Sequence, residues 1–183
     1  MLPEISKDQQ AKLDLYQQEI LRWNKTTNLI GRSTAESFKE DHLLNSLEML
    51  PYLEGNLPLI DIGTGGGLPG IPLAIMLPHR QVILTEVDKK KLAFLRYITA
   101  KLGLSNTQVV EILPHTVFDT PCDIVSRAYG PISRILTWTL SHAPRAKRYY
   151  ILKGTSVEKE LEEAGIPHAW VYPLTKGCIV IWE

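Results

Sequence analysis

Apolar residues recur through the first 55 residues at the spacing of helices that bury one face. The first set follows a capping-box pair, Ser6 and Gln9, and its members lie three or four positions apart: Leu13, Tyr16, Ile20 and Trp23. A second capping-box pair, Ser33 and Glu36, precedes another apolar set, and Pro51 is expected to end that helix. The pattern predicts an N-terminal extension of two helices.

Beyond residue 56 the pattern changes to short apolar runs that alternate with helical segments. The runs predict strands over 57–63, 81–87, 107–113, 123–128 and 148–154. Helical periodicity between them predicts helices over 71–77, 89–104, 131–142 and 157–164. Two extended runs, 169–174 and 176–183, close the chain and predict an antiparallel hairpin.

Strands that alternate with helices in this way form a parallel sheet with helices on both faces. We therefore expect a doubly wound α/β fold of about seven strands, with a C-terminal antiparallel hairpin. The length of 183 residues is typical of one domain. We expect residues 1–183 to form a single domain, with the helical extension over 1–55 and the α/β core over 56–183.

Composition adds mainly exclusions. Hydrophobic residues make up 44% and charged residues 22% of the chain, which is typical of a globular protein and unlike a disordered one. The longest uncharged stretch, 62–79, contains five glycines and three prolines, which would break a membrane-spanning helix. Cys122 and Cys178 are too few for a disulfide framework and lack metal-ligand spacing. We expect a cytoplasmic protein with no bound metal and no membrane association.

The net charge is zero, but basic residues cluster along the chain. Residues 124–157 contain no acidic residue and six basic ones: Arg127, Arg134, Arg145, Lys147, Arg148 and Lys153. Such a cluster is either a solvated surface or a face that accepts an anionic partner.

The richest segment for chemistry is the glycine turn, residues 61–70, which lies between a predicted strand and a predicted helix. Four of the five positions from Gly63 to Gly67 are glycine, more than a tight turn requires. Glycine lets the main chain approach a ligand closely, and such turns lie at the sheet edge where doubly wound folds bind ligands. Residues 65–70 also match the dinucleotide pattern G-x-G-x-x-G, although Pro69 removes an amide that a pyrophosphate would use.

An acidic residue ends the second predicted strand. Glu86 follows Gly63 by 23 residues, where a carboxylate commonly accepts hydrogen bonds from adenosine ribose hydroxyls. Asp88 is the competing candidate, and its alternative role is to cap the following helix. An adenosine without a pyrophosphate favours S-adenosylmethionine over a nicotinamide cofactor.

Several motifs in order resemble one family. They are Trp23-Asn24 with Asn28-Leu29, His42 to Leu47, Asp61 to Pro72 (DIGTGGGLPGIP), Glu86 with Lys90 and Phe94, Ser126-Arg127-Ala128, and Leu152-Lys153-Gly154. The sequence resembles the bacterial RsmG family, also called GidB, which methylates guanine N7 in small-subunit ribosomal RNA. The likeness covers nearly the whole chain. It departs from the family pattern at Ile30, at Asn45 in place of aspartate, and at residues 176–178, where the family usually has an arginine.

The resemblance implies a Rossmann-like class I S-adenosylmethionine-dependent methyltransferase, and roles for particular residues. The residues it implies for cofactor binding are Gly63, Gly65, Gly67, Leu68, Glu86, Asp88, Pro114, His115 and Arg127. The candidate catalytic residues, at the ends of the fourth and fifth strands, are Arg127 and Lys153. The candidate substrate contacts are Asn28, His42 and Arg134. The alternatives are structural: a turn cap for Asn28, a helix–sheet seam for His42, an exposed loop for His115 and surface ion pairs for Arg127 and Lys153.

The implied partner is 16S ribosomal RNA or the assembling small ribosomal subunit, and a monomer is the expected state. Guanine N7 carries a lone pair and no proton, so its methylation requires no general base. Three alternatives stay open from the residues themselves. They are a methyltransferase of the same fold acting on a small molecule or protein, a non-catalytic adenosine-binding module associated with ribosomes, and a nicotinamide oxidoreductase.

Overall fold

A seven-stranded sheet organises the chain, in the order β3-β2-β1-β4-β5-β7-β6. The structure is a computed structural model that describes residues 4–31, 35–155 and 157–183. The strands are β1 (Leu59–Asp61), β2 (Val82–Glu86), β3 (Thr107–Glu111), β4 (Cys122–Arg127), β5 (Ala146–Lys153), β6 (Trp170–Pro173) and β7 (Cys178–Trp182). The five strands from β1 to β5 are parallel, and β7 pairs antiparallel with both β5 and β6. The predicted doubly wound sheet and C-terminal hairpin are confirmed.

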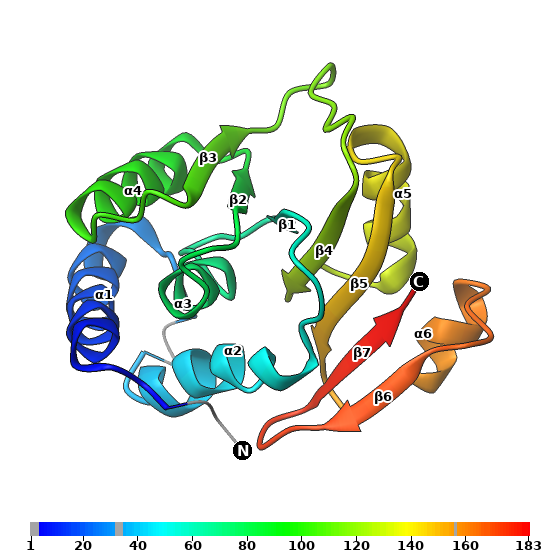
Figure 1. The fold of residues 1–183 in the computed structure, drawn as a ribbon, viewed down its shortest axis with the longest axis horizontal. Helices are drawn as coiled ribbons and strands as arrows, with labels where there is room; N and C mark the ends of the chain where they lie inside the picture. Colours follow the sequence, from blue (N-terminus) through cyan, green and yellow to red (C-terminus); the bar gives the residue numbers. More distant parts are fainter. Residues whose placement is uncertain (1–3, 32–34, 156) are drawn as a thin grey trace.

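The helices lie on both faces of this sheet (Figure 1). They are α1 (Lys7–Thr27), α2 (Asn45–Leu47), α3 (Gly70–Met76), α4 (Lys89–Lys101), α5 (Ile132–His142) and α6 (Glu158–Glu163). One core contains apolar residues of α1, α3 and α4 with Leu59, Leu84 and Val125 of the sheet. The other contains residues of α5 with the adjacent strand positions Ile60 and Ile124. Alternate strand residues therefore supply separate cores, because successive side chains point to opposite faces.

Both neighbours of β1 run parallel to it. Asp61, its last residue, is in register with Leu84 of β2 and Val125 of β4. The chain winds from β1 towards β3 on one side and from β4 onward on the other, so the winding reverses between β1 and β4. Ligands bind in the crevice outside the carboxyl ends of strands at such a reversal. The glycine turn leaves β1 at this place.

The second N-terminal helix differs from its prediction. The chain forms a π-helical segment, η2 (Lys39–Leu44), that continues into the short α2, and then a 3₁₀ turn, η3 (Leu50–Tyr52). Pro51 lies inside that turn and does not end a helix, because the first turn of a helix does not use the N–H group that proline lacks. The proposed cap at Ser33 falls outside the described residues.

Helix α1 covers the glycine turn from the outside. The Trp23 ring lies 5.4 Å from the Phe94 ring of α4, measured between centroids, which fixes α1 against the core. Asn28 ends the helix in the left-handed conformation, with φ 53°. Asn28 therefore stands in the turn that ends α1. Within the described part of the chain, no helix is both long and apolar enough to cross a membrane.

Candidate functional site

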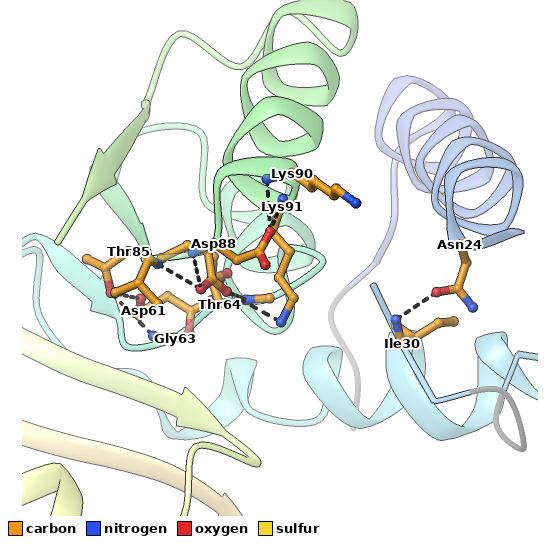
Figure 2. Close-up of polar contacts among 12 residues, drawn as sticks. Asn24, Ile30, Asp61, Gly63, Thr64, Thr85, Asp88, Lys90 and Lys91 are labelled. Carbon is orange, nitrogen blue, oxygen red and sulfur yellow. Dashed lines mark hydrogen bonds and ion pairs between the residues drawn. The ribbon is translucent and has the colours of Figure 1, made fainter. Parts of the chain in front are cut away.

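The buried carboxyl of Asp61 shapes the glycine turn. Its Oδ2 accepts hydrogen bonds from the Thr64 hydroxyl at 2.5 Å and from the Gly70 backbone N–H at 2.8 Å. Burial raises the pKa of Asp61 to about 7, although both hydrogen bonds oppose that shift. On the neighbouring strand, the Thr85 hydroxyl donates to the Asp61 carbonyl and accepts from the Gly63 N–H. Figure 2 shows these groups clustered where β1 and β2 end.

A cleft of about 320 Å³ lies beside this turn. Its walls come from the glycine turn, the segment after α1, η2, α4 and the end of β4: Leu29, Ile30, Gly31, His42, Gly63, Thr64, Gly65, Gly66, Leu68, Lys91, Arg127 and Ala128. Gly63 and Gly65 both have positive φ and are partly exposed here. A Cβ on Gly65 would meet nothing closer than 3.9 Å, so the backbone there is open to a ligand, whereas Tyr129 fills the corresponding space at Gly63. The Asn24 side chain accepts from the Ile30 N–H and so holds the segment after α1 in place (Figure 2).

Glu86 joins the end of β2 to the glycine turn. Its Oε2 accepts from the Gly65 N–H at 3.1 Å, and its Oε1 accepts from the N–H groups of Val87 and Asp88. Lys91 lies 3.9 Å from Oε2. Asp88 is exposed and caps α4, accepting from the N–H groups of Lys90 and Lys91 (Figure 2). Of the two acidic candidates, Glu86 is therefore the one that touches the glycine turn.

Arg127 and His42 form the opposite wall of the cleft. The Arg127 guanidinium Nη1 lies 2.5 Å from His42 Nδ1 and also donates to the Asp41 carbonyl. Burial and the adjacent Arg127 charge lower the pKa of His42 to about 4, so the imidazole is neutral near pH 7. Because arginine only donates, His42 Nδ1 accepts and its ring proton lies on Nε2. Arg127 Nε is buried and has no hydrogen-bond partner in the described structure.

A second cavity, of about 380 Å³, lies at the carboxyl ends of β4 and β5. Arg127 and Ala128 line both this cavity and the cleft. Lys153 lines it as well, and its ammonium group pairs with Glu160 at 2.5 Å and donates to the Gly130 carbonyl. The two candidate catalytic residues thus face one cavity.

Other predicted site residues lie elsewhere. Gly67 has a φ of 97°, and a Cβ there would meet Ile71 at 2.3 Å, so this glycine serves packing. Pro114 and His115 are exposed in the loop after β3 and are not among the residues that line the cleft. Asn28 is also exposed, and the three residues after it line the cleft. Arg134 is exposed on α5, with its guanidinium 4.7 Å from the Tyr129 ring centroid.

The basic stretch does not form one surface. Arg127, Arg134 and Lys153 lie near the carboxyl ends of β4 and β5. Arg145 and Lys147 lie at the other end of β5, and Arg148 there is paired with Glu54 and Glu183. These basic residues are close in sequence but separated in space, because β5 carries the chain from one end of the parallel strands to the other.

Two departures from the family pattern lie in contact. The Asn45 amide donates to the Lys176 carbonyl at 2.9 Å, and the Lys176 ammonium pairs with Asp41. Asp41 in turn precedes His42, which contacts Arg127. The departures therefore interact with each other behind the site, at the turn between β6 and β7.

Sequence reasoning missed two aromatic residues of the site. The Tyr16 hydroxyl donates to the Gly66 carbonyl at 2.8 Å, although its helical spacing marked it only as an apolar position. Tyr129 packs against Gly63, so closely that a Cβ on that glycine would lie 2.4 Å from the ring. Its position directly after Ser126-Arg127-Ala128 was the available signal.

Comparisons with known proteins agree on one family. A family model described as rRNA small subunit methyltransferase G (GidB) matches residues 9–169. Ribosomal RNA small subunit methyltransferase G of Neisseria gonorrhoeae strain NCCP11945 is 38% identical over 162 residues, which cover 88% of this chain and 78% of that protein. The protein of the same name from Hydrogenovibrio crunogenus is 37% identical over 87% of this chain and 75% of its own length.

Solved structures are similar in fold at low sequence identity. An S-adenosylmethionine-dependent methyltransferase from Aquifex aeolicus superposes with a TM-score of 0.55 at 18% identity, over 83% of this chain and 96% of that one. The human methyltransferase 10 domain-containing protein gives 0.56 at 16% identity, over 86% and 95%. The fold is that of class I S-adenosylmethionine-dependent methyltransferases, as expected from the sequence.

The raised pKa of Asp61 predicts a specific pH dependence of stability. Between its ordinary pKa of 3.8 and its folded pKa of about 7, the folded chain keeps a proton that the unfolded chain has lost. The contribution of Asp61 to the free energy of unfolding should therefore fall as the pH rises through this range. Asp61→Asn should remove that contribution, which urea denaturation of both proteins at pH 4 to 7 would measure.

His42 acts in the opposite direction, because its folded pKa is lowered to about 4. It stabilises the folded chain increasingly as the pH rises towards its ordinary value of 6.5. Since both proteins contain His42, the difference between their two pH profiles isolates Asp61. Parallel profiles would contradict the prediction.

Proposed function

Because this chain belongs to the rRNA small subunit methyltransferase G family, we propose that it transfers a methyl group from S-adenosylmethionine to N7 of a guanine in 16S ribosomal RNA. One arrangement carries the proposal. The glycine-lined cleft and the second cavity meet at Arg127 and Ala128, so a methyl donor and an acceptor could face each other there. The substrate is 16S ribosomal RNA or the assembling small subunit, and the chain acts as a monomeric single domain in which the segment after α1 completes the cofactor site.

The residues in and beside the cleft suit S-adenosylmethionine, and Glu86 reaches the glycine turn from the end of β2 without lining the cleft itself. A carboxylate has about four acceptor positions, and Glu86 uses two on Oε1 and one on Oε2, which leaves capacity for a ribose hydroxyl. The buried Arg127 Nε–H has no hydrogen-bond partner among the described residues, and a carboxylate such as that of the methionine part would satisfy it. Gly65 lines the cleft with open space where a Cβ would stand, so a ligand can approach its backbone closely.

When bound, the cofactor supplies an electrophilic methyl group on a sulfonium ion. Transfer would break the S–CH₃ bond as the N7–CH₃ bond forms, the bonding electron pair would stay on sulfur, and the positive charge would pass to the base. No proton is transferred, so the site requires no general base. Its residues must orient the two reactants, an effect that contributes about 7–11 kcal/mol in favourable cases.

Charges in the second cavity fit a base that becomes cationic. Glu160 neutralises Lys153 at 2.5 Å, so the lysine does not present an uncompensated charge to the acceptor. The neutral His42 adds no second charge beside Arg127. Arg127 lies between both ligands, and it orients them while its charge is partly spread by its contacts with His42 and the Asp41 carbonyl.

Methyl transfer to RNA is the direct test. The protein is incubated with methyl-labelled S-adenosylmethionine and either deproteinised 16S ribosomal RNA or small subunits, and the RNA is then digested to nucleosides. The expected product is labelled 7-methylguanosine. Label on another nucleoside, on a protein or on a small molecule would overturn the proposed acceptor, and cofactor binding without transfer would favour a non-catalytic module.

Glu86→Gln should weaken cofactor binding by about 1.5–3 kcal/mol, because the ribose loses a charged acceptor. Titration calorimetry with S-adenosylmethionine measures the affinity. Glu111→Gln is a matched control, since Glu111 occupies the same register position on the adjacent β3 and pairs with Lys89 at the surface. Equal affinities for wild type and Glu86→Gln would move the ribose contact to Asp88.

Arg134→Glu should flatten the dependence of RNA affinity on salt, and Arg145→Glu should not. Arg134 lies beside the second cavity, whereas Arg145 lies at the opposite end of β5. A lost phosphate contact lowers the slope of log affinity against log salt by about one unit. Filter binding of 16S ribosomal RNA at several salt concentrations measures it, and equal slopes for both variants would show that RNA docks elsewhere.

A further inference from the structure

The second cavity differs in character from the glycine-lined cleft. Apolar side chains of α5 and β5 form part of its wall, from Ile135, Ile151 and Leu152. Polar groups are contributed by Asn45, Lys153 and Glu160, and a single aromatic ring by Tyr129. A cavity with an apolar wall, one ring and a few polar groups suits a flat, partly polar ligand.

Tyr129 stands at the boundary between the two cavities. The edge of its ring packs against Gly63, because a Cβ built on that glycine would approach Cδ2 to 2.4 Å and Cε2 to 2.8 Å. Gly63 lines the cleft and Tyr129 lines the cavity. The ring is half-buried: it packs against the core that contains α5 without being one of its buried residues, and it also lines the second cavity.

The backbone around Tyr129 is held in a special conformation. Ala128 has a φ of 56° and Gly130 a φ of 136°, and the left-handed region is unfavourable for alanine. Lys153 fixes the turn by donating to the Gly130 carbonyl at 2.8 Å, and Glu160 accepts from the Ile132 N–H at 3.0 Å. Strained backbone of this kind persists where surrounding contacts hold it, and it concentrates at ligand sites.

We propose that this cavity receives the acceptor base of the RNA, a purine turned out of its stack, and that Tyr129 is the aromatic surface on which the base stacks. The inference rests on the proposed function and adds to it a base site and a positioning residue. Single-stranded or extruded bases are commonly recognised by stacking on aromatic side chains. Arg134, with its guanidinium 4.7 Å from the ring centroid, supports Tyr129 and contributes positive charge beside the entering strand.

The placement explains why the ring touches the glycine turn. A base stacked on Tyr129 would lie beside Arg127 and Ala128, the two residues that the cavity shares with the cleft. Tyr129 thus sets the distance between the base and the methyl donor through its contact with Gly63. Its hydroxyl is not required for this, so phenylalanine should replace it and an aliphatic residue should not.

The test compares Tyr129→Phe and Tyr129→Leu in labelled-methyl transfer to 16S ribosomal RNA, with Tyr172→Leu as control. Tyr172 is a partly exposed tyrosine of β6 that lines neither cavity. We expect Tyr129→Phe and Tyr172→Leu to remain within about twofold of wild type in kcat/KM. Tyr129→Leu should lose at least about tenfold, the range of one lost base stack, with calorimetric affinity for S-adenosylmethionine within about twofold of wild type.

The outcomes separate the inference from the function. Absence of transfer by the wild-type protein would overturn the proposed function. Active wild type with equal kcat/KM for the Phe and Leu variants would overturn the stacking role alone. A parallel loss of cofactor affinity in Tyr129→Leu would assign the ring to the cofactor site and also overturn it. Tyr129→Gln serves as a second non-aromatic variant if Tyr129→Leu lowers the melting temperature.

Discussion

Burial of the Asp61 carboxyl under the glycine turn is the interaction on which the shape of the turn and of its cleft depends. One oxygen holds the Thr64 hydroxyl and the Gly70 N–H, and so brings the end of β1 and the start of α3 together. The intervening backbone then exposes Gly63 and Gly65, and it places Gly65 N–H on Glu86. Burying this group has a cost, which its raised pKa records, and that cost is offset by the two hydrogen bonds and by the shape they impose.

The sheet could be predicted from the sequence because the patterns that specify its strands lie within short segments of the chain. Strands buried on both faces, such as β1 and β2, are continuous apolar runs, and their alternation with helices leaves few topologies. The π-helical segment could not be predicted, because contacts distant in the chain accompany its shape. His42 within it packs against Arg127, 85 positions later. Helix propensity and the spacing of apolar residues give no sign of that contact. The capping pattern at Ser33 suggested an ordinary helix.

The site was predicted in part, for the same physical reason. Glu86 and Arg127 end their strands and Gly63 follows β1, so the topology alone brings them to one edge of the sheet. Tyr16 and Tyr129 reach the glycine turn through tertiary contacts, which helical spacing does not indicate for Tyr16 and which only the preceding Ser126-Arg127-Ala128 motif could have suggested for Tyr129. The basic stretch over 124–157 suggested one charged surface, which is wrong because residues a few positions apart on an extended strand lie far apart in space. The eight residues of β5 separate Lys147 from Lys153 by roughly 20 Å at about 3.3 Å per residue.

Arg127 lines both cavities, so binding in one cavity is thermodynamically linked to binding in the other. A ligand that draws the guanidinium towards the cleft changes the shape of the second cavity, and a ligand in the second cavity acts equally on the cleft. The coupling free energy between the two binding events must be the same in either order. His42 and the Asp41 carbonyl, which hold Arg127 from η2, set how far it moves. The affinity of the protein for a ligand in one cavity should therefore depend on whether the other cavity is occupied, and η2 holds the arginine that the two cavities share.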